Sequence, residues 1–441
     1  MKTRLSILLS LIVIFASFSQ DKKWTLKECV DHALENNISI KQNELRVQIS
    51  EELVTSAKGN FLPNLNGSIS PGLNFGSSIG QDGTRISTDN FRSSFSLNSN
   101  TTIFNGFRNL NIYKQAQLGV ESSKLDLEKI QDDISLFVVN AYLNILFAKE
   151  NLMVAKTQYE ISAKQIEITE SQVEAGAKPK GDLLNAESTA ATDAQNVITV
   201  ENTLDLALLS MAQLLQISSD NFDVTTIEID SPSAALLYDN SNMVYEKALE
   251  NRPEIENAKL GVENASLDIE VAKGAYLPSL SFFAGAGSSY QNIFNELFSN
   301  QDFSTQLSDN LGYNLGFSLN IPIFNRNQTK SNVNQSIINQ KIREFDLEDQ
   351  KLQLKETIER AFLDAKAAAK SFEAAEKSLV AQNEAFKNAQ ESFDLGAMTS
   401  FDFDQVRNRL VNAESTLIRA KYDYVFKSKV LKFYYGESIL E

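Results

Sequence analysis

The chain has very little of the residue types that carry most catalysis and metal binding. Its 441 residues include one cysteine, Cys29, and one histidine, His32. A single cysteine excludes an intrachain disulfide and a cysteine metal cluster, and a lone histidine is a weak metal ligand. There is also no glycine-rich phosphate loop and no Ser-His-acid set. We therefore expect no enzyme, no catalytic residues, no cofactor and no metal site.

Turn-forming residues and long apolar runs are sparse as well. With 18 glycines and 7 prolines over the whole length, the chain is expected to form long uninterrupted elements. After the first 20 residues no segment reaches about 18 consecutive apolar residues, so any membrane contact would be made by β-strands. The formal net charge is −16, which disfavours nucleic-acid binding because phosphates are neutralised by Lys and Arg.

The first residues are typical of a secretory signal. Lys2 and Arg4 precede an apolar run over 5–18, and small residues follow. The run is too short to span a bilayer, so we predict a signal peptide over 1–19 that is cleaved after Ser19. Cys29 lies about ten residues beyond that point rather than at the new terminus, so we expect no lipid anchor.

The rest of the chain is an internal duplication. Ala-Leu-Glu-Asn at 33–36 returns at 248–251, and Ile-Phe-Asn at 103–105 returns at 323–325. Each half is expected to contain a helix, two strands, a very long helix, a tight turn and a returning helix.

These repeats predict the domain organisation. The first repeat covers 20–217, a linker covers 218–240, and the second repeat covers 241–441. The first repeat is predicted to have helix 24–58, strands 61–75 and 91–104, long helix 105–175 and helix 181–217. The second is predicted to have helix 241–274, strands 278–288 and 311–324, long helix 325–395 and helix 400–436.

The long helices carry a heptad pattern. Seam positions advance by alternating steps of four and three, from Ile134 to Val173 in the first half and from Leu354 to Phe393 in the second. A sustained period of 3.5 predicts coiled-coil packing with a left-handed supercoil. A helix of about 70 residues reaches about 100 Å, so it must pack against other long helices.

The predicted strands alternate between apolar and polar side chains. The fourth strand is the clearest, with Gly, Asn and Ser on one face and these predicted lipid-facing residues on the other: Leu311, Tyr313, Leu315, Phe317, Leu319 and Ile321. Such alternation is typical of a transmembrane β-barrel, although a half-buried antiparallel sheet gives the same pattern. Four strands cannot close a barrel, so several copies would have to share one. Three copies would supply twelve strands, but the residues leave the copy number open.

The chain resembles the TolC family of outer-membrane efflux proteins over essentially its whole mature length. The resemblance rests on the repeated segments above, on Asn-Arg-Pro-Glu at 251–254, on Tyr-Leu-Pro-Ser-Leu at 276–280, and on the turn glycines Gly176 and Gly396. It implies a mainly α fold with a transmembrane β-barrel. Three chains would form a twelve-stranded β-barrel in the outer membrane, continuous with a coiled-coil α-barrel in the periplasm. The linker would be an equatorial segment.

The resemblance also implies a function. The chain would be the exit duct of a tripartite efflux pump or a type I secretion system in a Gram-negative bacterium, conducting drugs, metal ions or proteins. The homotrimer would contact outer-membrane lipid and dock on a periplasmic adaptor (membrane fusion) protein and, through it, an inner-membrane pump. One alternative is a passive porin, which has no use for paired helices of about 100 Å. Another is a periplasmic adaptor or coiled-coil scaffold, although adaptors have one helical hairpin per chain rather than two.

Two helix turns are implied as functional. Family members contact their adaptor through an Arg-Leu-x-x-Gly pattern, which would occur once in each turn. This chain has the glycine of both patterns and lacks the Arg-Leu pair of both. The implied docking residues are Gln172, Val173 and Gly176 in the first turn, and Ser392, Phe393 and Gly396 in the second.

The family closes its periplasmic mouth with acidic rings close to these turns. The gate candidates are Asp402, then Asp404 and Asp182. An Asp in the first turn of a helix also caps free N–H groups and complements the helix dipole, so capping alone is the alternative role.

Overall fold

The computed structural model describes residues 23–79, 81, 83–226, 238–295 and 299–439. The predicted signal peptide and the middle of the predicted linker lie outside this described part. The chain divides into two compact units. One contains residues 45–125 and 256–348, and the other contains the segments before 45, from 126 to 255 and after 348.

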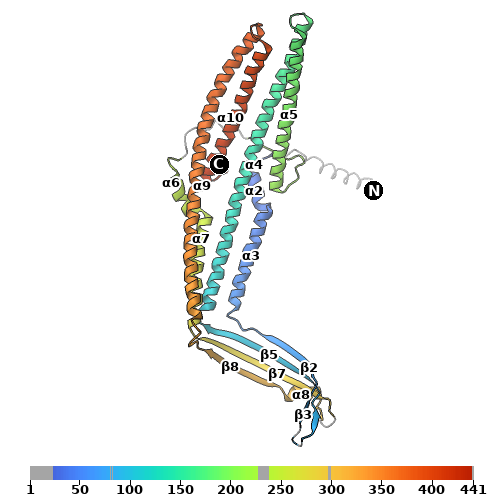
Figure 1. Ribbon diagram of the computed structural model, residues 1–441, viewed down its shortest axis with the longest axis vertical. Coiled ribbons are helices and arrows are strands. Elements are labelled where there is room, and N and C mark those ends of the chain that lie inside the picture. Colours follow the sequence, from blue (N-terminus) through green and yellow to red (C-terminus); the bar gives the residue numbers. More distant parts are fainter. Residues whose placement is uncertain (1–22, 80, 82, 227–237, 296–298, 440–441) are drawn as a thin grey trace, which may run out of the picture. The chain divides into compact units, whose positions relative to one another are not determined.

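The first repeat has these elements (Figure 1): β1 (Lys23–Trp24), α2 (Leu26–Asn36), α3 (Ile38–Gly59), β2 (Asn66–Asn74), β3 (Ser77–Ile79), β4 (Arg85–Ser87), β5 (Asn90–Asn105), α4 (Arg108–Glu174) and α5 (Lys180–Leu215). After β6 (Asp223–Val224), the second repeat has α6 (Ser241–Asn251), α7 (Pro253–Lys273), the 3-10 turn η1 (Gly274–Tyr276), β7 (Ser279–Ile293), α8 (Phe303–Asp309), β8 (Gly312–Asn320), α9 (Gln328–Asp394) and α10 (Ser400–Tyr435). The predicted order of helix, strand pair, long helix and returning helix is present in both halves.

Two helices that the sequence predicts as continuous are interrupted. Instead of one helix over 24–58, α2 ends before Asn37, which is extended with ψ 131° and accepts a hydrogen bond from the backbone N–H of Ser39. An Asn side chain that bonds to its own backbone competes with the helix. Instead of one helix over 241–274, the chain breaks at Arg252, because Pro253 disfavours the helical conformation in the residue before it.

The main sheet has the strand order β2-β5-β7-β8, and all of its pairs are antiparallel. Its strands differ in length from the predicted ones. β2 begins at Asn66 rather than at 61, and β7 continues to Ile293 rather than ending at 288. β8 stops at Asn320, two residues before Pro322, which lacks the N–H that a strand pairing needs.

The sheet has one apolar and one polar face. Ile69, Phe95 and Leu97 share a face, whereas Ser68 and Ser96 lie on the opposite one, where their hydroxyls are 2.7 Å apart. The residues predicted to face lipid are exposed in the single chain, Tyr313 by 77%. Short helix α8 covers one end of the apolar face, because the Phe303 ring lies 6.0 Å from that of Phe95 and 5.1 Å from that of Tyr290.

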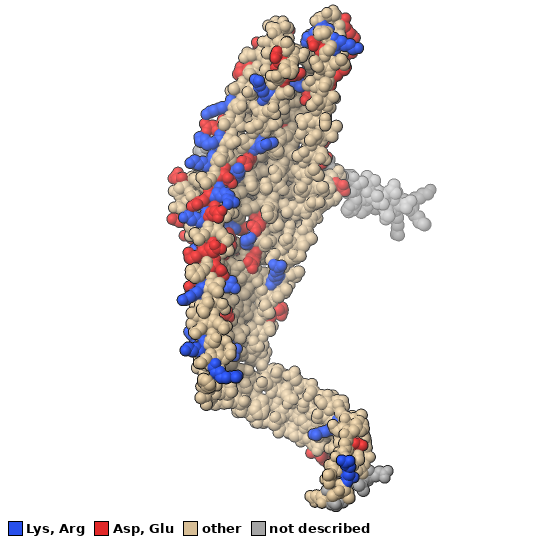
Figure 2. Space-filling view, viewed as in Figure 1, with Lys and Arg blue, Asp and Glu red and all other residues tan. Residues whose placement is uncertain are grey.

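The long helices α4 and α9 have 67 residues each, which corresponds to about 100 Å. Predicted seam positions are buried along both helices: Ile134, Val138, Ile145, Ala148 and Ala155 in α4, and Leu354, Ile358, Ala365, Ala368 and Phe372 in α9. In the view of Figure 2, charged side chains gather along α9 and at the ends of the helical hairpins. Among the described helices, none is long and apolar enough to cross a membrane.

A two-residue parallel pairing of β1 with β6 joins the start of the described chain to the predicted linker. Tyr142 of α4 donates its hydroxyl to the carbonyl of Thr225 at 2.6 Å. Lys149, also of α4, donates to the carbonyl of Val224 at 2.7 Å and pairs with Asp223. Burial alone would raise the pKa of Asp223, but hydrogen bonds from Lys149 and Lys23 outweigh burial and lower it.

Candidate functional site

The two turns that the sequence indicates as docking sites have the same backbone structure. Gly176 and Gly396 have φ values of 70° and 74°, in the left-handed region that favours glycine. The next residue in each turn donates its N–H back into the preceding helix, Ala177 to Gln172 and Ala397 to Ser392, both at 2.8 Å. This bonding is a Schellman end, so both glycines terminate their helices.

Arg407 lies between the two hairpins close to these turns. Its side chain is only 4% exposed. Its Nη2 atom is 3.3 Å from Oδ2 of Asp193 on α5 and 3.7 Å from Oδ1 of Asp404, one turn earlier on α10. The buried Nε atom has no hydrogen-bond partner among the described residues. The guanidinium therefore links the α9–α10 hairpin to the α4–α5 hairpin through a pair of charges removed from water.

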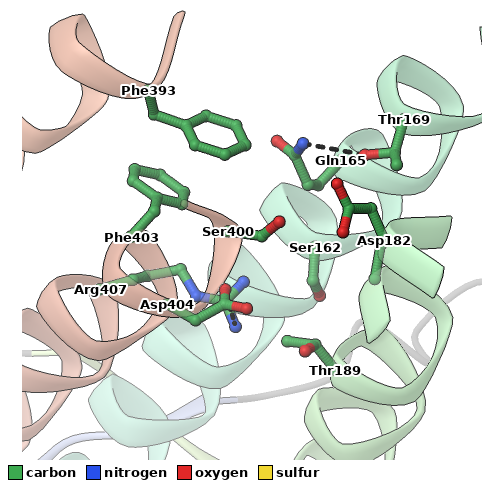
Figure 3. Close-up of a pocket in the computed structure, with 11 residues that line it drawn as sticks. Ser162, Gln165, Thr169, Asp182, Thr189, Phe393, Ser400, Phe403, Asp404 and Arg407 are labelled. Atoms are coloured by element: carbon green, nitrogen blue, oxygen red, sulfur yellow. Dashed lines mark hydrogen bonds and ion pairs between the residues drawn. The ribbon is translucent and has the colours of Figure 1, made fainter. Parts of the chain in front are cut away.

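A small cavity lies beside Arg407 (Figure 3). The α4–α5 hairpin lines it with Ser162, Gln165, Thr169, Asp182, Ala186 and Thr189, and the α9–α10 hairpin with Phe393, Ser400, Phe403, Asp404 and Arg407. Its volume of about 20 Å³ is enough for about one water molecule. Drug-sized ligands need about 300 Å³ or more, so this cavity belongs to the contact between hairpins and does not hold cargo.

Two of the three gate candidates line this cavity, Asp182 in the first turn of α5 and Asp404 in α10. Burial raises the pKa of the Asp404 carboxyl above its ordinary value, the positive charge of Arg407 opposes the rise, and Asp193 adds to it. The ionised Asp404 is thus penalised where it lies, so a change in packing between the hairpins would shift the pKa of this carboxyl.

Asp402, the first gate candidate, does not reach the cavity. It is exposed, its backbone N–H donates to Oγ1 of Thr399 at 3.1 Å, and the Thr399 hydroxyl donates to its carboxylate at 2.7 Å. Thr399 is thereby the N-cap of α10. This geometry supports the capping role, and the Asp402 side chain remains exposed.

The docking candidates differ in how accessible they are. Phe393 is buried, with its ring stacked 4.7 Å from that of Phe403 and the Lys178 ammonium 4.5 Å from its centre. Sequence reasoning passed over the apolar residues that the second turn does expose, Leu395 at 84% and Phe401 at 70%. Leu395 and Phe401 are therefore far more accessible to solvent than Phe393.

Arg407 was also missed by the sequence reasoning, although a signal for it exists. Along α10, Phe403, Arg407 and Leu410 follow one another at steps of four and three, which is the spacing of a heptad seam. A charged residue at a position that should face another helix indicates a buried ion pair, and it also predicts an acidic partner on the neighbouring helix.

Comparison with known proteins agrees with this architecture. The family profile described as Outer membrane efflux protein matches residues 29–215 and 244–437. Outer membrane protein TolC of Escherichia coli (strain K12) is 24% identical over 442 residues, which cover 98% of this chain and 86% of that protein. Outer membrane efflux protein BepC of Brucella suis biovar 1 (strain 1330) is 22% identical over 409 residues, covering 92% of this chain and 84% of that protein.

A solved structure shares the fold. The crystal structure of the Campylobacter jejuni CmeC outer membrane channel matches with a TM-score of 0.74 and 20% sequence identity, covering 93% of this chain and 85% of that one. The family profile matches each repeat separately, from within α2 to the end of α5 and from within α6 to just past α10. With its duplicated repeat and a matching profile over most of its length, this chain belongs to the outer membrane efflux protein family.

Proposed function

We propose that three copies of this chain form the exit duct through which a tripartite efflux pump or type I secretion system moves cargo across the outer membrane of a Gram-negative bacterium. The observation that carries the proposal is the pair of free edges on the four-stranded sheet. Among the described strands, β2 and β8 each pair on one side only. Unpaired backbone groups cost several kcal/mol each in lipid, so β8 of one copy would pair with β2 of the next.

The side chains of the sheet support the same assembly. The apolar face, with Tyr313, Leu315 and Phe317 exposed in the single chain, would contact lipid. The polar face, rich in Ser, Asn and Gly, would line a water-filled lumen. Three chains would give twelve strands, and lumen-facing and lipid-facing residues would alternate along every strand as in known outer-membrane barrels.

The hairpin turns would be the docking point for a periplasmic adaptor protein that is driven by an inner-membrane pump. Leu395 and Phe401 supply exposed apolar area at one turn, and Gly176 and Gly396 fix the backbone of both. Because the Arg-Leu pairs are absent, this contact would depend on apolar burial more than on an arginine.

The acidic residues beside the turns would control the periplasmic mouth. Three copies of Asp402 that faced a common axis would repel one another and attract cations. Asp182 and Asp404 would act at the contact between hairpins, which has to change if the mouth is to widen.

The direct test is the native mass and single-channel conductance of the detergent-purified mature chain. A heat-labile trimer that inserts channels into planar bilayers would support the duct. A soluble monomer without conductance would overturn it, and would favour the periplasmic scaffold instead. A conducting trimer that fails to bind any adaptor in the cell envelope would favour the passive porin.

A further inference from the structure

Arg92 is the only charged residue in the four strands of the main sheet. It is the third residue of β5, at the end of that strand far from α4 and adjoining the β3–β4 hairpin. Figure 2 shows the same contrast: charged side chains are dense over the long helices and few over the strands. A solitary charge in otherwise uncharged strands needs an explanation.

The register places Arg92 on the polar face of the sheet. Its cross-strand partners are Gly72 on β2 and Gln291 on β7. It alternates with Phe91, which lies on the apolar face near Tyr290, with ring centres 6.1 Å apart. An arginine on the lipid face near the midplane would cost about 2–4 kcal/mol, whereas the opposite face would be in water.

The surroundings leave the guanidinium accessible. Arg92 is exposed, and none of the hydrogen bonds or ion pairs within the described part of the chain includes its side chain. Gly72 offers no side chain beside it, and the space where a Cβ would stand is open. The acidic residue closest in sequence, Asp89, accepts a hydrogen bond from the backbone N–H of Gly76 at 2.8 Å. Among the described residues of the strands, the neighbours along the polar face are amides, hydroxyls and glycines, and none of them carries a charge that would compensate Arg92.

We infer that three copies of Arg92 form an anion-attracting ring in the lumen, at the end of the barrel away from the helices. This inference rests on the proposed duct. The ligand class is a small molecule or ion with carboxylate, phosphate or sulfonate groups, which a guanidinium binds through paired N–H donors. Strand spacing of about 4.8 Å and a tilt of about 40° give a twelve-stranded barrel a radius of about 12 Å. The Debye length is about 10 Å in 0.1 M salt and about 30 Å in 0.01 M salt, so the ring acts across the whole lumen at low salt.

The test is the reversal potential of wild-type and Arg92→Gln channels under a tenfold KCl gradient. We expect the substitution to raise the ratio of cation to anion permeability roughly threefold or more when the dilute side is about 10 mM, and by less than about 1.5-fold when it is about 0.3 M. Arg92→Lys keeps the charge and should keep the wild-type ratio. Arg85→Gln is the matched control, because it removes the same charge from β4, outside the main sheet.

Inorganic tripolyphosphate added on the barrel side provides a second readout. It should block wild-type channels at low salt and block Arg92→Gln channels at least about tenfold more weakly, while Arg85→Gln behaves as wild type. Equal permeability ratios in wild-type and Arg92→Gln channels at 10 mM would overturn the ring and leave the duct standing. A wild-type chain that forms no channels would overturn the duct itself, and this inference with it.

Discussion

The guanidinium of Arg407 lies 3.3 Å from the carboxylate of Asp193, and the two residues belong to different helical hairpins. Arg407 is almost fully buried and Asp193 is 20% exposed. A charge pair in such a place contributes little when intact, because desolvation offsets attraction, but losing one partner leaves the other charge uncompensated. The pair therefore favours the register between the two hairpins in which these two residues meet.

Asp193→Asn should loosen the contact between hairpins. It removes the closest counter-charge of Arg407 and leaves Asp404 at 3.7 Å. We expect a local cost of about 3 kcal/mol, seen as roughly 100-fold faster hydrogen exchange in the first turns of α10.

The triple variant Asp193→Asn/Asp404→Asn/Arg407→Met should recover most of that protection, because all three charges of the cluster are then removed together. Glu201→Gln is the control, since Glu201 pairs with Lys156 at 3.7 Å while both are about half exposed. That change should cost less than about 1 kcal/mol. Equal effects of Asp193→Asn and Glu201→Gln would contradict a buried pair.

The stability of the hairpin contact should depend on pH through Asp404. Because burial raises the folded-state pKa of this carboxyl, its ionised form is penalised above that pKa, and the penalty disappears as the pH falls toward the ordinary value of 3.8. Asp404→Asn should therefore be better protected from exchange than wild type at pH 7, and equal to it near pH 4. A variant less protected than wild type at pH 7 would mean that attraction to Arg407 outweighs burial.

Asp402→Ala should raise single-channel conductance and weaken block by Mg²⁺ by roughly tenfold if Asp402 forms an acidic ring. Thr399→Ala is the matched control, because it removes the hydroxyl that caps α10 and leaves the charge. Both variants should lose about 1 kcal/mol of helix stability. If conductance and block stay unchanged in Asp402→Ala, the residue is only part of the cap.

Tryptophan placed on β8 should report which face meets lipid. The chain has one tryptophan, Trp24, so Trp24→Phe gives a silent background. Phe317→Trp should then be quenched by lipids brominated deep in the acyl chain several-fold more strongly than Ser318→Trp, its neighbour on the opposite face. Equal quenching at 317 and 318 would contradict the assignment of the apolar face.

The sequence predicts the large features of this fold well because each feature is encoded by many residues. The heptad seam of α4 and α9 repeats over most of 67 positions, and the strand alternation is supported by a second copy in the other repeat. Single-residue events were less predictable. Asn37 interrupts a helical pattern without a proline or glycine, and its side chain accepts a hydrogen bond from the Ser39 N–H and donates one to the Leu214 carbonyl.

The candidate site was only partly predictable. Gly176 and Gly396 stand out because their left-handed backbone favours one residue type. The burial of Phe393 agrees with its place at the end of the heptad seam, whereas the partner of Arg407 is more than 200 positions away in the sequence. The pairing of Arg407 with Asp193 follows from how the two hairpins meet, and a periodic pattern within one helix does not identify which residue the partner is.

The parallel pairing of β1 with β6 has a consequence for the order of folding. Lys23 and Asp223 are 200 positions apart, yet they are register partners. The whole first repeat therefore separates the two strands of this pair, and closing so large a loop carries an entropic cost that only later contacts offset. Until that loop closes, β1 has no pairing partner. Assembly of the first repeat is therefore complete only when β6, in the segment that follows it, pairs with β1.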